Sequence, residues 1–155
     1  MILNSRMKNL IESNGIDLEN LPRPPDALCR IVDSGFVRTN DSIVLKTQAS
    51  GARSVKLSDF PDETGYEAFV NHFHLEDYLS NDEMSTSDRL RVGIALARNL
   101  RELLRFSFPM ENFAVILSVN GAHYIVRFYK IRTGQDWLVD DLETYEEEAL
   151  LVFRP

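Results

Sequence analysis

The sequence predicts an α+β fold: a single domain, residues 1–155, in which an antiparallel sheet of four to six strands is backed by one long amphipathic helix. Two apolar runs flank Asn120-Gly121, which is typical of a tight β-hairpin. A helical pattern of apolar residues runs from about residue 88 to 106, shortly before that hairpin. The chain of 155 residues is 44% hydrophobic, which is enough for one domain with its own core.

The predicted hairpin covers residues 113–131, FAVILSVNGAHYIVRFYKI. Asn-Gly readily adopts the two positive φ angles of a type I′ turn, and a two-residue turn fixes the register of the strands. With this turn, one wholly apolar face pairs Leu117 with Tyr124, Val115 with Val126, and Phe113 with Phe128. The mixed face pairs Ser118 with His123, Ile116 with Ile125, and Ala114 with Arg127. Such a difference between the faces is typical of a sheet with one side on a core.

The predicted helix begins after an N-cap at either Ser85 or Ser87. When the helix is plotted at 100° per residue, its apolar side chains fill one broad arc. The same region contains five arginines: Arg89, Arg91, Arg98, Arg101 and Arg105. An arc this wide indicates a helix that lies against a sheet. We expect it to cover the apolar face of the hairpin.

Shorter elements complete the predicted fold. Prolines at residues 22, 24 and 25 favour an extended connector, and residues 26–32 fit either a turn of helix or a short strand. The remaining expected elements are a helix at 2–13, a strand at 42–45, a long aromatic-rich strand at 66–75, a short helix or extended segment at 136–145, and a last strand at 149–153.

Composition limits the location and the class of partner. Cys29 is the single cysteine, so no intramolecular disulfide is possible. Residues 1–10 lack a basic start followed by an apolar run, and no apolar run approaches the roughly 20 residues that cross a bilayer. We therefore expect a soluble cytoplasmic protein without a membrane partner. The net charge of −7 opposes binding to nucleic acid and favours a basic protein partner.

The sequence offers little for catalysis. It contains no glycine-rich phosphate loop, no GxSxG and no paired CxxC, so we expect no enzyme activity and no cofactor. One alternative is a metal site, because His72 and His74 have the spacing of residues that share a strand face. His123 from the hairpin is the candidate third ligand. In the competing interpretation, these histidines pack among aromatic residues as hydrogen-bonded side chains.

Acidic residues are concentrated near the end of the chain. Residues 136–155 carry seven acidic side chains and one basic one, whereas residues 88–105 carry five arginines and two acidic residues. Like charges this close repel one another. Either they form a solvated loop, in part neutralised by the helix arginines, or they form a surface that meets a basic partner.

Residues 126–153, VRFYKIRTGQDWLVDDLETYEEEALLVF, resemble small cytoplasmic immunity proteins of bacterial toxin systems, including contact-dependent growth inhibition. The shared features are a basic–aromatic strand end, a Trp-Leu pair, an acidic Asp-Leu-Glu-x-Tyr segment and a final aliphatic strand. The resemblance implies stoichiometric, non-catalytic neutralisation of a cognate toxin, of which many are nucleases with basic clefts. The candidate toxin-binding residues are Asp136, Trp137, Asp140, Asp141, Glu143, Tyr145, Glu146, Glu147 and Glu148.

Overall fold

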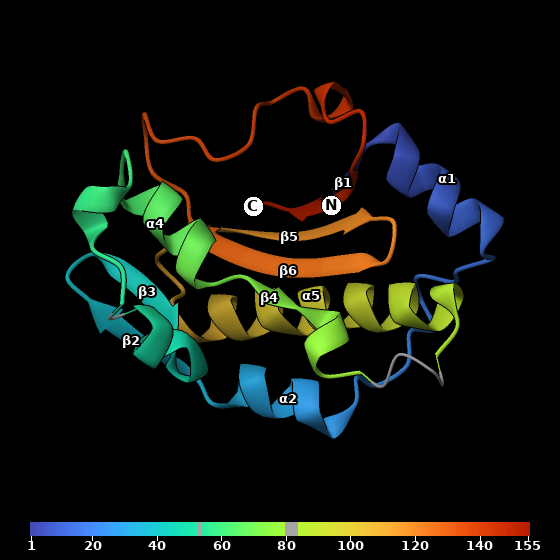
Figure 1. Ribbon diagram of the computed structural model, residues 1–155, viewed down its shortest axis with the longest axis horizontal. Helices are drawn as coiled ribbons and strands as arrows, with labels where there is room; N and C mark the ends of the chain where they lie inside the picture. The colour runs from blue at the N-terminus through green and yellow to red at the C-terminus, as the bar shows by residue number, and fades with distance from the viewer. Residues whose placement is uncertain (53, 80–83) are drawn as a thin grey trace.

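The centre of the fold is a five-stranded antiparallel sheet in the order β1-β7-β5-β6-β4 (Figure 1). The computed structural model describes residues 1–52, 54–79 and 84–155. A separate two-stranded sheet joins β2 to β3. The α+β class and the predicted number of strands in the main sheet are confirmed. The strand bounds are Ile2–Leu3 (β1), Phe36–Thr39 (β2), Ser42–Leu45 (β3), Phe73–His74 (β4), Phe113–Asn120 (β5), His123–Lys130 (β6) and Ala149–Phe153 (β7).

The β5–β6 hairpin forms as predicted, but its register is shifted by two residues. Val119 pairs with Tyr124 and Leu117 with Val126, because the turn is centred on Gly121-Ala122 and not on Asn120-Gly121. Gly121 has a φ of +57° and Ala122 is not among the residues with positive φ, which fits a type II′ turn with glycine first. Asn120 therefore stays in the strand opposite His123, which adds one more pair to the ladder.

The long helix α5, Thr86–Ser107, covers one face of this hairpin, as predicted. Its N-cap is Ser85, whose hydroxyl accepts a hydrogen bond from the Asp88 N–H. Gly93 permits a close approach to the sheet, since an added Cβ would lie 3.1 Å from a δ carbon of Leu117. Helix α2, Asp26–Asp33, packs on α5 from the side away from the sheet (Figure 1), which explains the broad apolar arc.

The predicted strand at 66–75 is wrong over most of its length. Residues Glu63–Val70 form helix α4, and only Phe73–His74 pair as a strand. Asp62 caps the helix by accepting a hydrogen bond from the Gly65 N–H. Glu67 and Asn71 lie four residues apart and accept hydrogen bonds from the backbone of β3, at Ile43 N–H (2.7 Å) and Leu45 N–H (3.0 Å). Side chains of α4 and of its C-cap, Asn71, thus take the place of a strand partner for β3.

The remaining helices are short. The predicted helix at 2–13 begins later, because Ile2–Leu3 pair with β7 and α1 covers Ser5–Ser13. Residues predicted as either helix or strand at 26–32 form α2. Other elements are α3 (Ala49–Ala52) and single 3₁₀ turns at Lys46–Gln48 (η1), Leu57–Asp59 (η2), Leu75–Asp77 (η3) and Leu142–Thr144 (η4).

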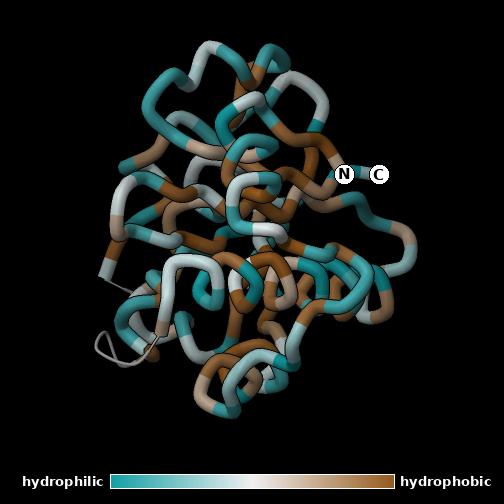
Figure 2. Tube along the Cα trace, turned by 90° about the vertical axis from the view of Figure 1, so that its right-hand side faces the viewer, coloured by the Kyte–Doolittle hydropathy of each residue, from teal (hydrophilic) through white to brown (hydrophobic). Residues whose placement is uncertain are grey.

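The core runs on both sides of the main sheet. One apolar cluster joins α1, α2 and α5 to one face of the sheet, and a second lies on the opposite face. Apolar stretches of the chain run through the interior in Figure 2, while many outer loops are hydrophilic. Within the described residues, no helix combines the length and the apolar character that a membrane span requires.

Candidate functional site

The acidic segment, residues 136–148, lies across the face of the sheet opposite α5 (Figure 1). Two buried leucines, Leu138 and Leu142, hold it there by packing against Ile116 and Leu150. The segment therefore covers part of the predicted "mixed" face of the hairpin, where Ala114 and Ile116 belong to a second core. Most of the segment has no regular structure apart from η4. An irregular segment with apolar anchors on one side directs its polar side chains outward.

The carboxylates of the acidic segment face solvent. Only Glu148 is half-buried; the exposed members are Asp136, Asp140, Asp141, Glu143, Glu146 and Glu147. Asp140 pairs with Arg154 at 3.5 Å, and not with an arginine of α5. Two of the α5 arginines are engaged elsewhere, since Arg98 donates to the Leu18 carbonyl and Arg101 lies over the Phe153 ring. The acidic surface is thus not folded inward against the basic helix.

Hydrogen bonds attach the end of the acidic segment to the start of α1. Asn4 is buried, and its side-chain amide donates to the Glu148 carbonyl at 2.7 Å. Its Oδ1 accepts from the N–H groups of Met7 and Leu150, at 3.0 and 2.9 Å. Glu143 accepts from the N–H and the hydroxyl of Ser5, at 2.9 and 3.0 Å, so its negative charge lies at the N-terminus of α1. Glu143 therefore stabilises the fold, as well as adding charge to the surface.

Two apolar side chains emerge among these carboxylates. Trp137 is 38% exposed and Val139 53% exposed. The Arg127 guanidinium lies 5.5 Å from the Trp137 ring centroid, and burial lowers the pKa of Arg127. Tyr145 is half-buried, and its hydroxyl accepts from the Val139 N–H at 3.3 Å. Trp137 and Val139 are available to a partner, whereas Tyr145 mainly shapes the segment.

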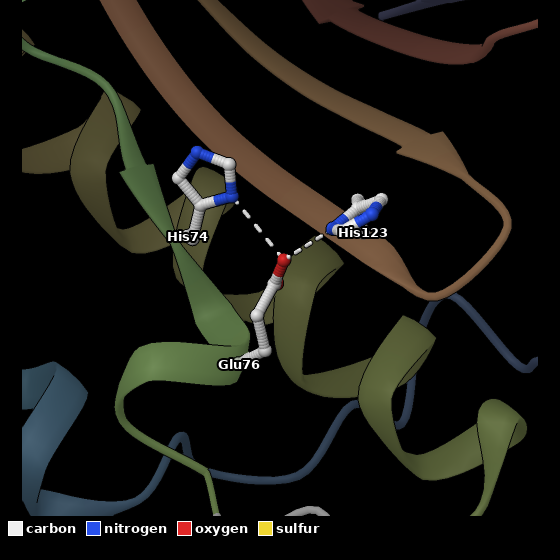
Figure 3. A group of neighbouring side chains, drawn as sticks. All are labelled: His74, Glu76 and His123. Atoms are coloured by element: carbon white, nitrogen blue, oxygen red, sulfur yellow. Dashed lines mark hydrogen bonds and ion pairs between the residues drawn. The ribbon is translucent and has the colours of Figure 1, made fainter.

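A second candidate site brings together His74, Glu76 and His123 (Figure 3). Strand β4 carries His74, η3 carries Glu76, and β6 begins at His123. The Nδ1 atoms of His74 and His123 lie 3.2 and 2.9 Å from the same oxygen of Glu76, Oε1. The other oxygen, Oε2, accepts from the Tyr124 N–H at 3.2 Å. We call this group the histidine–glutamate cluster.

Of the three histidines predicted as metal ligands, the structure brings together only His74 and His123. His72 is not a member of the cluster, because its Nδ1 pairs with the carbonyl of Phe69 and its ring only packs edge-on against that of His74. Strand β4 is too short to place His72 and His74 on one strand face. Sequence reasoning missed Glu76, although the spacing His74-x-Glu76 next to a strand was a usable signal.

The hydrogen bonds of the cluster favour the ionised form of Glu76. Partial burial alone would raise its pKa. Hydrogen bonds from its own backbone, from His123, from the Tyr124 N–H and from His74 outweigh this effect and lower the pKa of Glu76 to about 2. A negative charge therefore lies between two imidazole rings at the edge of the sheet.

The sequence also gave no sign of an ion-pair network at the opposite end of β6. Asp41, in the β2–β3 turn, binds Lys130 at 2.7 Å and Arg132 at 3.1 Å, and these hydrogen bonds lower the pKa of Asp41. Arg132 also pairs with the fully buried Glu67 at 2.9 Å. The network joins the small sheet to the main sheet and leaves the acidic segment untouched.

Comparison with known proteins places the chain in a family. Residues 2–153 match the Uncharacterized protein PM0498 family. The chain belongs to this family. No curated protein and no solved structure matches it. The PM0498 family match extends over both the acidic segment and the histidine–glutamate cluster, so both candidate sites lie in the family region.

Proposed function

We propose that this member of the PM0498 family is a non-catalytic immunity protein, which neutralises a cognate bacterial toxin by covering a basic surface with its acidic segment. One observation carries the proposal: the carboxylates of residues 136–148 face outward around Trp137 and Val139, on a segment that is anchored to the sheet. The resemblance of residues 126–153 to immunity proteins supports the toxin as the partner. A nuclease-type toxin fits best, because a cleft that holds phosphates is basic.

The electrostatics of the segment suit such a partner. Carboxylates that face a basic cleft accelerate association and select against partners of the wrong charge. Asp136, Glu146 and Glu147 have no hydrogen-bond or ion-pair partner for their side chains among the described residues. These three carboxylates are therefore free to meet lysines or arginines. A partner would not have to break existing ion pairs to reach them.

The packing of the segment suits an inhibitor as well. Aromatic residues at the centre of an interface, surrounded by a polar rim, commonly supply most of the binding energy. Trp137 has this position, and its ring is held against Arg127. The backbone of the acidic segment is fixed by the packing of Leu138 and Leu142 and by the hydrogen bond from Asn4 to the Glu148 carbonyl. Little conformational entropy of this segment is therefore lost on binding.

The first step of the test is genomic, since we expect a gene for a large secreted toxin immediately upstream. Binding to the C-terminal domain of that toxin is then measured by titration. A triple charge reversal, Asp136→Lys with Glu146→Lys and Glu147→Lys, is expected to weaken binding at low salt by about tenfold or more, mainly through slower association. The matched control reverses exposed acids on other surfaces, Glu12→Lys with Asp33→Lys and Glu102→Lys, and changes the net charge equally. We expect the control to bind within a few-fold of the wild type.

A second arm tests the apolar centre. Trp137→Ala is expected to cost about 2 kcal/mol or more of binding free energy, whereas Tyr78→Ala, with a similarly exposed aromatic ring, is expected to cost little. If the wild type, both triple variants and Trp137→Ala all bound the toxin with equal affinity, that result would show that the acidic segment is not part of the interface. Absence of an upstream toxin gene would remove the partner.

A further inference from the structure

We propose that His74, Glu76 and His123 form a binding site for a divalent transition-metal ion of the Zn²⁺ type. The site is independent of the toxin surface, because its residues lie in β4, η3 and β6 and not in residues 136–148. One ligand atom from each residue lies within 4.8 Å of the other two. Figure 3 shows both imidazole rings turned toward the carboxylate.

The distances match those between neighbouring ligands of one ion. Zinc bonds to nitrogen and oxygen are about 2.0–2.2 Å long, so adjacent ligand atoms lie about 3.0 Å apart in octahedral and about 3.4 Å apart in tetrahedral geometry. The two Nδ1–Oε1 distances are 3.2 and 2.9 Å. All three ligand atoms lie within 4.8 Å of one another, so one ion placed between them could be shared by the three side chains.

The set of donors selects the class of metal. Two imidazoles and one carboxylate suit Zn²⁺, Co²⁺, Ni²⁺ and related ions, whereas Mg²⁺ and Ca²⁺ prefer oxygen ligands alone. Three protein ligands leave at least one position for water or for another ligand. The His123 side chain is 68% exposed, so this position is accessible from solvent.

Two of the three ligands, Glu76 and His74, are held in place before any ion binds. Glu76 is oriented through its second oxygen by the Tyr124 N–H, and the neighbouring Leu75 is buried in the core. His74 pairs with Ile125 across the β4–β6 ladder, which places its ring next to the start of β6. Outer contacts of this kind orient metal ligands and strengthen binding. A bound ion would connect β4, an edge strand of the sheet, to β6.

The experiment uses full-length protein that has been treated with a chelator and then titrated with ZnCl₂ in a calorimeter. We expect saturable one-to-one binding at micromolar Zn²⁺, a rise in Tm with added Zn²⁺, and a visible Co²⁺ spectrum of nitrogen–oxygen ligation. MgCl₂ is expected to give neither heat nor a shift in Tm. Loss of a residue that only orients a metal ligand typically lowers metal affinity by roughly 10–100-fold. His123→Ala and Glu76→Ala remove a ligand itself, so we expect their Zn²⁺ affinity to fall by at least that factor.

His72→Ala is the matched control, since it removes the neighbouring histidine outside the cluster and is expected to bind Zn²⁺ like the wild type. His123→Ala is the main variant, because its exposed side chain makes unfolding an improbable cause of lost binding. Two results would overturn the proposal: no Zn²⁺ binding by the wild type at up to millimolar metal, or equal loss in His72→Ala and His123→Ala. The cluster would then be a set of hydrogen bonds between β4 and β6.

Discussion

The side chain of Asn4 donates a hydrogen bond to the backbone carbonyl of Glu148, 144 residues later in the chain, over 2.7 Å. The same side chain caps α1 through the Met7 N–H and binds the Leu150 N–H at the start of β7. Asn4 is only 1% exposed. One buried amide thus fixes the first helix, the last strand and the end of the acidic segment relative to one another.

Replacing Asn4 by alanine is expected to lower the free energy of unfolding by about 2–4 kcal/mol, because a helix cap is lost and buried N–H groups of Met7 and Leu150 lose their acceptor. Urea unfolding measures the change. Asn9→Ala, at an exposed position of α1, is the control and is expected to stay within about 0.5 kcal/mol of the wild type. Equal stability of the two variants would show that the Asn4 contacts contribute nothing.

Local patterns were sufficient for the hairpin, the long helix and the last strand. The faces of β5 and β6 were predicted correctly despite the wrong register, because a shift of two residues leaves each side chain on its own face. The position of the turn was not predictable from Asn120-Gly121 alone. Gly121 can occupy either central position of a two-residue turn, and only the complete ladder decides between them.

Contacts between distant residues explain the errors. The sequence YEAFVNHFHL is rich in aromatic residues and has a β-like pattern. In the structure, Glu67 in α4 and Asn71 at its C-cap instead accept hydrogen bonds from the backbone of β3. In the same way, composition identified the acidic segment and Trp137, but not the hydrogen bonds from Ser5, at the start of α1, to Glu143. No local pattern reports a hydrogen bond between residues that are more than a hundred positions apart.

Glu67 and Arg132 form the most buried ion pair of the described residues. Glu67 is fully buried, and its two oxygens accept hydrogen bonds from Ile43 N–H, Lys130 N–H and two guanidinium nitrogens of Arg132. This carboxylate replaces a missing strand partner for both β3 and β6. Its charge is tolerated because the guanidinium lies directly against it.

Removing the cation alone should therefore be costly. Arg132→Met is expected to destabilise the protein by about 3–5 kcal/mol, because Glu67 is left as a buried charge without a counterion. Glu67→Gln in the Arg132→Met background removes that charge, so we expect a coupling energy of about 1–3 kcal/mol in a double-mutant cycle of urea unfolding. Arg105→Met, on the exposed side of α5, is the control. Strict additivity of the two changes would contradict the pairing.

The contact between Gly93 and Leu117 makes a prediction for the packing of α5 on the sheet. A Cβ at position 93 would lie 3.1 and 3.2 Å from the two δ carbons of Leu117 and 3.3 Å from a δ carbon of Leu75. Both leucines are buried, so neither can move without disturbing the core. The strain of overpacking, about 1–3 kcal/mol, exceeds the gain of about 1 kcal/mol in helix propensity.

We therefore expect Gly93→Ala to lower the free energy of unfolding by about 1 kcal/mol, against the usual benefit of alanine in a helix. Gly51→Ala is the matched control, because Gly51 lies in α3 and nothing lies within 4 Å of its added Cβ. That variant is expected to be neutral or more stable by up to about 1 kcal/mol. Urea unfolding of both variants decides the question. If Gly93→Ala were as stable as Gly51→Ala, α5 would not lie as close to Leu117 as its backbone requires, and the core between helix and hairpin would be looser than described.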